Sequence, residues 1–233
     1  KVFIIPDLST QQAALRTGKI DVLIGVDAED AKSLMRTNPE LLWSRYPEEG
    51  GRGPAIQMRW DVKPFDDIRV RQAMMMAINY DEIIDSYYGG KAIKLHYPIR
   101  YIPEQASFYV PLERMPEVVQ QMYGYHPDIA MKLLDEAGLP GPNRFTTSIV
   151  ASTVQDVDLL AVIKAYWAKI GVTLNIDMKD DTVWRTMSTA KTYAQGVFQT
   201  ISPSENEKFD AVDANSSANY AVVNDSYVQE LKL

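Results

Sequence analysis

The stretch that decides the fold runs from Pro64 to Ile84 and reads PFDDIRVRQAMMMAINYDEII. Its first four residues predict a turn that leads into a helix. One face of that helix is apolar, because apolar residues recur at helical spacing at Val70, Ala73, Met74, Ala77 and Ile78. Asn79 is expected to end this helix and to cap a second one, with Glu82 three residues further on. We therefore predict two consecutive helices, the second ending at Gly89-Gly90.

The residues before this stretch alternate between short apolar runs and helical patterns. We expect a strand at 2–5, a helix capped by Ser9 or Thr10 that ends near Gly18, a second buried strand at 22–26 and a helix at 28–37. Three glycines and a proline at 48–54 predict a loop. A strand at 55–60 then leads into the deciding stretch.

The same alternation continues towards the C-terminus. An aromatic-rich segment at 91–124 has no clean period and predicts a long ordered loop. We expect helices at 127–138, 156–170 and 183–190, strands at 145–150, 172–178 and 196–201, a polar irregular segment at 202–219 and a last helix at 225–231. Because strands and helices alternate throughout, the predicted class is α/β with a mixed or mostly parallel sheet.

Composition excludes several kinds of function. The 233 residues include 24 Lys and Arg against 31 Asp and Glu, so the net charge of −7 disfavours a nucleic-acid partner, which would need clustered basic residues. The absence of cysteine excludes disulfides, thiolate metal sites and a cysteine nucleophile. No apolar run approaches the ~18 residues of a membrane span, and the first residues do not resemble an export signal.

Catalytic signals are poor. The chain contains no nucleophile elbow, no Walker-type phosphate loop and no dinucleotide fingerprint. Its two histidines, His96 and His126, are too far apart in sequence for a helical metal pair. The acidic pairs at 66–67, 135–136 and 180–181 coincide with helix signals, where carboxylates stabilise helix ends. We therefore expect no enzymatic activity, no metal and no cofactor.

Four ordered stretches resemble one family. Pro64 to Ile84 resembles the signature of the family 5 extracellular solute-binding proteins, the peptide- and nickel-binding group of transporter receptors. Three further stretches agree with that family in order and spacing: LRTGKIDV at 15–22, YHPDIAMKLLDEAG at 125–138 and WAKIGVTLNI at 167–176. Each match falls on a helix or strand boundary, so these motifs identify a fold rather than a chemistry. Arg69 and Arg71 are accordingly interpreted as structural charges beside Asp66 and Asp67.

The resemblance implies a lobe of the type II periplasmic-binding-protein kind, with a mixed β-sheet flanked by helices. Residues 1–54 would form the terminal portion of a first lobe and residues 55–233 most of a second, with the remainder of both lobes and any export signal outside this chain. The implied protein is a monomeric, periplasmic or cell-surface receptor of an ABC uptake transporter. Its partners would be a peptide or other small ligand and a membrane permease. The alternative is the solute-sensing domain of a regulatory protein.

The resemblance also suggests where ligand would bind. Members of the family often place an aromatic residue at the position of Trp184, and peptide-binding members carry an aspartate near 196–203 that pairs with the peptide amino terminus. That aspartate is missing here, and the uncharged Gln199, Thr200 and Ser202 favour a neutral ligand, since a buried ammonium without a carboxylate would be costly. Further candidates are Ser152, Thr153, Arg59, Trp60 and Tyr97. For Trp60 and Tyr97, packing in the core is an equal alternative.

Overall fold

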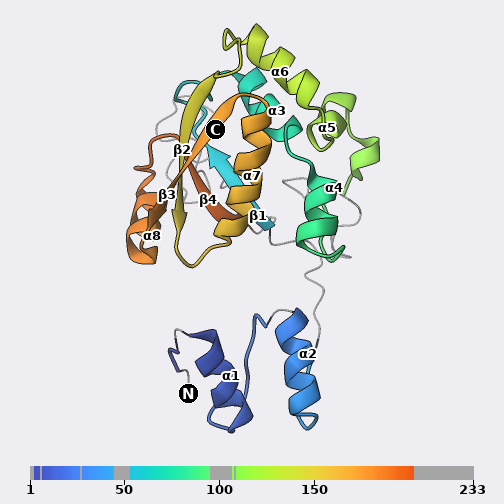
Figure 1. Cartoon of the computed structure of the whole chain (residues 1–233), viewed down its shortest axis with the longest axis vertical. Coiled ribbons are helices and arrows are strands. Elements are labelled where there is room, and N and C mark those ends of the chain that lie inside the picture. Colours follow the sequence, from blue (N-terminus) through green and yellow to red (C-terminus); the bar gives the residue numbers. More distant parts are fainter. Residues whose placement is uncertain are drawn as a thin grey trace. The chain divides into compact units, whose positions relative to one another are not determined.

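The computed structural model describes residues 3–5, 7–26, 28–44, 53–94, 107 and 109–201. The chain divides into two compact units, Lys1–Pro47 and Glu48–Leu233 (Figure 1). This division lies a few residues before the lobe boundary expected after residue 54. The predicted irregular segment at 202–219 and the helix at 225–231 lie outside the described residues.

The described part of the first unit contains two helices, α1 (Leu8–Arg16) and α2 (Ala28–Thr37). Asp7, rather than Ser9 or Thr10, caps α1, because its carboxylate accepts a hydrogen bond from the Thr10 amide at 2.6 Å. Gln12 Nε2 on α1 donates to Asp30 Oδ2 on α2 at 2.7 Å. This bond ties the two helices to each other.

The two strands predicted for this unit are wrong in the described residues. Residues 3–5 and 22–26 form no strand, and Ile4 and Ile24 are 93% and 84% exposed. A β-strand needs a neighbouring strand to satisfy its backbone N–H and C=O groups. The described part of this unit offers no such neighbour, so the apolar pattern alone does not make these segments strands.

The second unit is built on a four-stranded sheet of order β1-β4-β2-β3. Its strands are β1 (Gly53–Met58), β2 (Phe145–Ser152), β3 (Val172–Lys179) and β4 (Gly196–Ile201). β2 runs parallel to both β3 and β4, whereas β1 pairs antiparallel with β4. The sheet is therefore mixed, as predicted, and β1 ends at Met58 instead of Trp60.

Helices cover both faces of this sheet. On one face, α3 (Ile68–Met76), α6 (Pro127–Glu136) and α7 (Val157–Lys169) form the main core with Ile149, Leu174 and Phe198 (Figure 1). On the other face, α8 (Asp181–Ala190) packs through Trp184 and Met187 against Val150 and Val197. Side chains alternate between the faces of a strand, so adjacent residues such as Ile149 and Val150 belong to different clusters.

The stretch from Pro64 to Ile84 forms its predicted first helix as α3, whereas the second is not a single α-helix. Asn79 caps α4 (Tyr80–Glu82) by accepting a hydrogen bond from the Glu82 amide at 3.2 Å. The backbone then widens into a π-helix, η1 (Ile83–Tyr87), in which the Tyr88 amide reaches the Ile83 carbonyl.

The loop predicted at 91–124 is only partly irregular. A 3₁₀ turn, η3 (Leu112–Arg114), and a short helix, α5 (Glu117–Met122), form its last third. Gln120 Nε2 on α5 donates to the Met115 carbonyl at 2.8 Å, which folds this segment back on itself. Among the described residues, no helix has the length and apolar character needed to cross a membrane.

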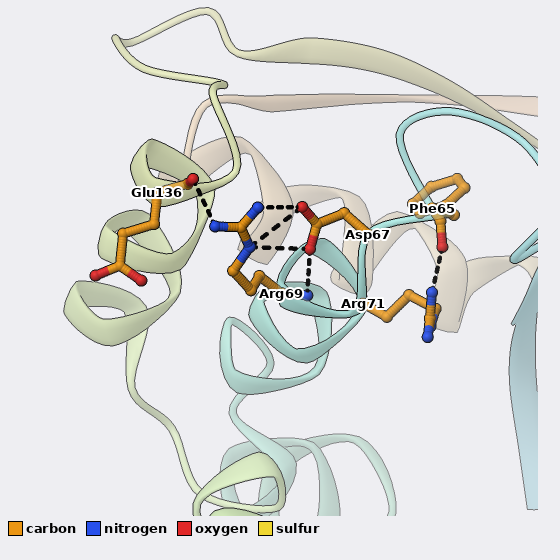
Figure 2. A network of polar contacts seen from close by, with 5 residues as sticks. All are labelled: Phe65, Asp67, Arg69, Arg71 and Glu136. Atoms are coloured by element: carbon orange, nitrogen blue, oxygen red, sulfur yellow. Dashed lines mark hydrogen bonds and ion pairs between the residues drawn. The ribbon is translucent and has the colours of Figure 1, made fainter.

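A polar network joins the start of α3 to the end of α6 (Figure 2). Asp67 caps α3 and forms a bidentate ion pair with Arg69, whose Nη1 also donates to the Glu136 carbonyl at 2.7 Å. These hydrogen bonds lower the pKa of Asp67 to about 2. Arg71 donates to the Phe65 carbonyl. Both guanidinium groups are held by the chain itself, in agreement with the structural role expected for them.

Candidate functional site

The candidate site lies where the parallel strands end. The register pairs Ser152 at the end of β2 with Lys179 at the end of β3, and Val150 with Val197 on β4. Continuing that register brings Gln199 level with Ser152. In open α/β sheets, ligands bind outside the carboxyl ends of the strands. We call this end of the sheet the carboxyl edge; it holds four of the predicted site residues, Ser152, Thr153, Gln199 and Thr200.

Ser152 connects this edge to α8. Its side chain is fully buried, and its Oγ donates to Asp181 Oδ1 at 3.0 Å. The other oxygen of Asp181 accepts a hydrogen bond from Arg185 Nε at 2.6 Å. The hydrogen bonds from Arg185 and from Ser152 hold the pKa of Asp181 below its ordinary value. This carboxylate therefore stays ionised and is already engaged on both oxygens.

A tight turn follows Ser152 and leads into α7. The Ser152 amide donates to Gln155 Oε1 at 2.8 Å, and the Thr153 amide donates to the Lys179 carbonyl on β3 at 3.2 Å. Thr153 is exposed, and Val154 is 72% exposed. The turn thus presents short side chains to solvent from a backbone that is tied to β3.

Gln199 lies on the α8 face of β4 and is buried. Its Nε2 donates to Gln57 Oε1 on β1 at 2.7 Å. The next residue, Thr200, belongs to the opposite face of the strand and is exposed. At β4 the carboxyl edge therefore combines a buried amide pair with an exposed hydroxyl, both uncharged, while at β3 the Lys179 ammonium is paired with Asp177 at 2.8 Å.

Trp184 lies one turn into α8 and packs against the sheet. Its neighbours are Val150, Val197 and Tyr193. The indole Nε1 is buried, and no hydrogen-bond acceptor for it exists among the described residues. A buried N–H without an acceptor costs about 1–3 kcal/mol, so an acceptor supplied by a ligand or a water would stabilise this position. A ligand role for Trp184 stays a prediction.

Arg59 and Trp60 lie away from the carboxyl edge. The Arg59 amide donates to the carbonyl of Gln195, just before the amino end of β4. Its guanidinium forms a bidentate pair with Asp61, at 3.0 and 2.7 Å, and donates to the Tyr193 carbonyl at 3.2 Å. The hydrogen bond to Asp61 raises the pKa of Arg59 and lowers that of Asp61. Trp60 is 41% exposed.

The structure does not bring all nine predicted residues together. Ser152, Thr153, Gln199 and Thr200 share one edge, and α8 carries Trp184 next to it, while Arg59 and Trp60 lie beyond the other end of β1. Tyr97 and Ser202 lie outside the described residues. Two polar partners of these residues were missed: Asp181, which binds Ser152, and Gln57, which binds Gln199 from β1. The acidic pair at 180–181 was recognised only as a helix-end signal, because its partner Ser152 is 29 residues away in sequence.

Comparison with solved structures defines the class of fold as that of the type II periplasmic binding proteins. The substrate-binding protein CtaP of Listeria monocytogenes superposes with a TM-score of 0.72 at 17% identity, over 98% of this chain and 45% of that one. The periplasmic binding protein DppA of Helicobacter pylori, in complex with the peptide STSA, gives 0.63 at 21% identity, over 97% and 48%. Both superpositions cover nearly all of this chain and less than half of the solved structure.

The chain belongs to the bacterial extracellular solute-binding proteins, family 5, whose family model matches residues 1–228. It is 32% identical to heme-binding protein A of Haemophilus influenzae over 181 residues, which covers 75% of this chain and 30% of that protein. It is 30% identical to the dipeptide-binding protein of Escherichia coli over 179 residues, covering 74% and 31%. The chain thus spans about a third of the length of these curated relatives.

Proposed function

We propose that this chain is part of the substrate-binding component of an ABC uptake transporter. Residues 1–54 would form the terminal portion of the first lobe, and residues 55–233 would form most of the second lobe. The observation that carries the proposal is the family match, which spans residues 1–228. The relatives reported above are named as binding proteins, which favours a transport receptor over a regulatory sensor.

The proposed mechanism is reversible capture of a solute between two lobes. Closure of the lobes would bury the ligand, with no bond made or broken, and a membrane permease would receive it outside the cytoplasm. The carboxyl edge would form one half of such a site, and this proposal is supported by the hydrogen bonds that tie the edge to α8 through Ser152 and to β1 through Gln199. We further propose that the receptor acts as a monomer and has no enzymatic activity.

The ligand group that meets the carboxyl edge is proposed to be neutral and polar. Gln199 and Thr200 are uncharged, and the carboxylate of Asp181 is engaged by Ser152 and Arg185. An ammonium group would lack an available carboxylate among these residues, and its burial would be costly. A peptide whose amino terminus lies elsewhere, or another small polar solute, fits these groups better.

Thermal denaturation of the complete gene product in the presence of candidate solutes tests the proposal. Dipeptides, glutathione and haem are suitable probes, because relatives of the chain are named for binding them. Ligand at about one hundred times its Kd stabilises a protein by roughly 2.7 kcal/mol, so a specific solute should raise the melting temperature clearly. A panel that also includes sugars and metal chelates and shifts nothing would contradict the receptor function.

A pair of threonine variants tests the location of the site. Thr200 and Thr146 are both exposed strand residues, but Thr200 lies at the carboxyl edge and Thr146 near the opposite end of β2. Thr200→Val should weaken binding of the solute found in the panel by about fivefold, the value of one hydrogen bond. Thr146→Val is the matched control and should bind normally. Equal affinities of the two variants would place the ligand away from Thr200.

A further inference from the structure

Tyr87 reaches the turn of the candidate site from a distant part of the chain. Its hydroxyl donates a hydrogen bond to Asp156 Oδ1, across 69 residues of sequence. Asp156 ends the turn that begins at Ser152 and caps α7, accepting a hydrogen bond from the Leu159 amide at 3.2 Å. One carboxylate oxygen therefore joins η1, the turn and the first residues of α7.

On the α7 side of the turn, Tyr88, next to Tyr87, also interacts with Asp156: burial and the Asp156 carboxylate raise the pKa of its hydroxyl. On its β3 side, the turn is held by the Thr153 amide on Lys179 and by the Ser152 hydroxyl on Asp181. Further bonds of the turn are local. The Ser152 amide donates to the Gln155 side chain, the Val154 amide to the Ser152 Oγ, the Gln155 amide to the Ser152 carbonyl and the Val157 amide to the Gln155 carbonyl. Since Thr153 and Val154 are exposed, packing adds little to hold this turn.

The π-helix η1 explains why Tyr87 faces Asp156. In a regular α-helix, Tyr87 would follow Ile83 on the buried face, since residues four apart share a face. In η1 the Tyr88 amide instead reaches the Ile83 carbonyl, five residues back, and Tyr88 packs against the main core. Tyr87 is left 37% exposed, edge-on to the Tyr88 ring at 5.0 Å between centroids. Single π-turns of this kind are frequent at functional sites.

The Tyr87 hydroxyl and the Asp156 carboxylate are suited to a lasting hydrogen bond. Burial and the hydrogen bond to Asp156 both raise the pKa of Tyr87, so the hydroxyl keeps its proton and remains a donor. Hydrogen bonds to an ionised acceptor are stronger than those between neutral groups.

We infer that Tyr87 is a positioning residue that holds the Ser152–Asp156 turn in its binding conformation through the carboxylate of Asp156. The inference relies on the proposed function for the role of the turn, but the contact itself can be tested without a ligand. Loss of the hydroxyl should loosen the turn and leave the sheet and the core of α7 unchanged.

Hydrogen–deuterium exchange of the Tyr87→Phe variant of this chain, compared with the wild type, tests the contact between Tyr87 and Asp156. Amides of residues 153–159 should exchange about tenfold faster than in the wild type, while those of β3 and of the rest of α7 keep their rates. Tyr125→Phe is the matched control, because Tyr125 is also 37% exposed and edge-on to another tyrosine, Tyr166, at 5.8 Å. Unchanged exchange at 153–159, or an equal rise throughout the unit, would overturn the inference.

A second measurement separates this inference from the proposed function. In the complete gene product, Tyr87→Phe should weaken binding of whichever of dipeptide, glutathione or haem raises the melting temperature, by several-fold relative to Tyr125→Phe. Faster local exchange with unchanged affinity would refute the positioning role while leaving the receptor function intact. If no probe binds the wild type, the receptor function fails, and the exchange result still decides whether Tyr87 holds the turn.

Discussion

Single glycines end two of the main helices, and they do so under different constraints. Gly138 follows α6 and Gly171 follows α7, both with a φ of +81°. A Cβ added at Gly138 would meet nothing within 4 Å, whereas at Gly171 it would lie 2.5 Å from the Pro142 carbonyl oxygen. The positive φ is therefore the same at both positions, and only at Gly171 would an added Cβ meet another atom closely.

Alanine substitutions at Gly138 and Gly171 separate the cost of backbone strain at a positive φ from the cost of steric overlap. Gly138→Ala should destabilise the protein by about 1–2 kcal/mol, the cost of the left-handed conformation for an L-residue. Gly171→Ala should cost about 2 kcal/mol more, because the backbone carbonyl of Pro142 must move. Urea denaturation of the two variants measures the difference in the free energy of unfolding. Equal midpoints would show that the loop at Pro142 moves aside without a measurable cost.

The network at the start of α3 makes stability depend on pH through one residue. The pKa of Asp67 is lowered to about 2, below its ordinary 3.8. A lowered folded-state pKa stabilises the protein above pH 4, and this contribution is lost as the pH falls towards 2. Asp67→Asn keeps the helix cap, since Asn and Asp cap equally well, but cannot form the ion pair with Arg69.

Between pH 5 and pH 2, the melting temperature of the wild type should therefore fall further than that of Asp67→Asn. In an Arg69→Gln background, the difference between Asp and Asn at position 67 should shrink, because the partner that lowers the pKa is missing. Parallel pH profiles of wild type and Asp67→Asn would show that the ion pair does not stabilise the fold.

At the scale of elements, helices were predicted well because their signals are local. α3, α6, α7 and α8 each combine an apolar stripe with a cap or stop residue nearby, such as Asp156 before α7 and Gly171 after it. The strands predicted at 2–5 and 22–26 failed because an apolar run cannot specify a partner strand. The π-helix η1 was missed for a related reason, since Tyr87 contacts a residue 69 positions away.

The candidate site was predictable only in part. Ser152, Thr153, Gln199 and Thr200 could be proposed because they follow or end apolar strands. Their grouping at one edge depends on the parallel register of β2 with β3 and β4, which single-sequence patterns do not determine. Arg59 and Trp60 follow β1, and the antiparallel pairing of β1 with β4, which the sequence pattern does not determine, places them at the other end of the sheet.

At the scale of the whole molecule, the two compact units differ in how much core they contain. Among the described residues of the first unit, the buried apolar side chains are Ala14 and Leu34, while Leu42 and Trp43 are 101% and 65% exposed. The second unit encloses a continuous core that includes Phe65, Leu134 and Trp167. Small units with little buried apolar area are marginally stable.

Residues 48–233 expressed alone should therefore keep the main cooperative thermal transition of the whole chain, within a few degrees. Residues 1–47 alone should show little helix by circular dichroism, because two short helices joined by few contacts are marginal in water. A large loss of melting temperature in 48–233 would show that the first unit contributes to the stability of the second.

The pairing of β1 with β4 also means that β1 can join the sheet only after β4 has been synthesised. Gly53 pairs with Ile201, so β1 leaves the ribosome long before its partner exists. At about 5–20 residues per second, the roughly 140 residues between the two strands take about 7 to 30 s to appear. During that interval Ile56 and Met58 have no sheet to join, and the nascent chain must be kept from aggregating until β4 arrives.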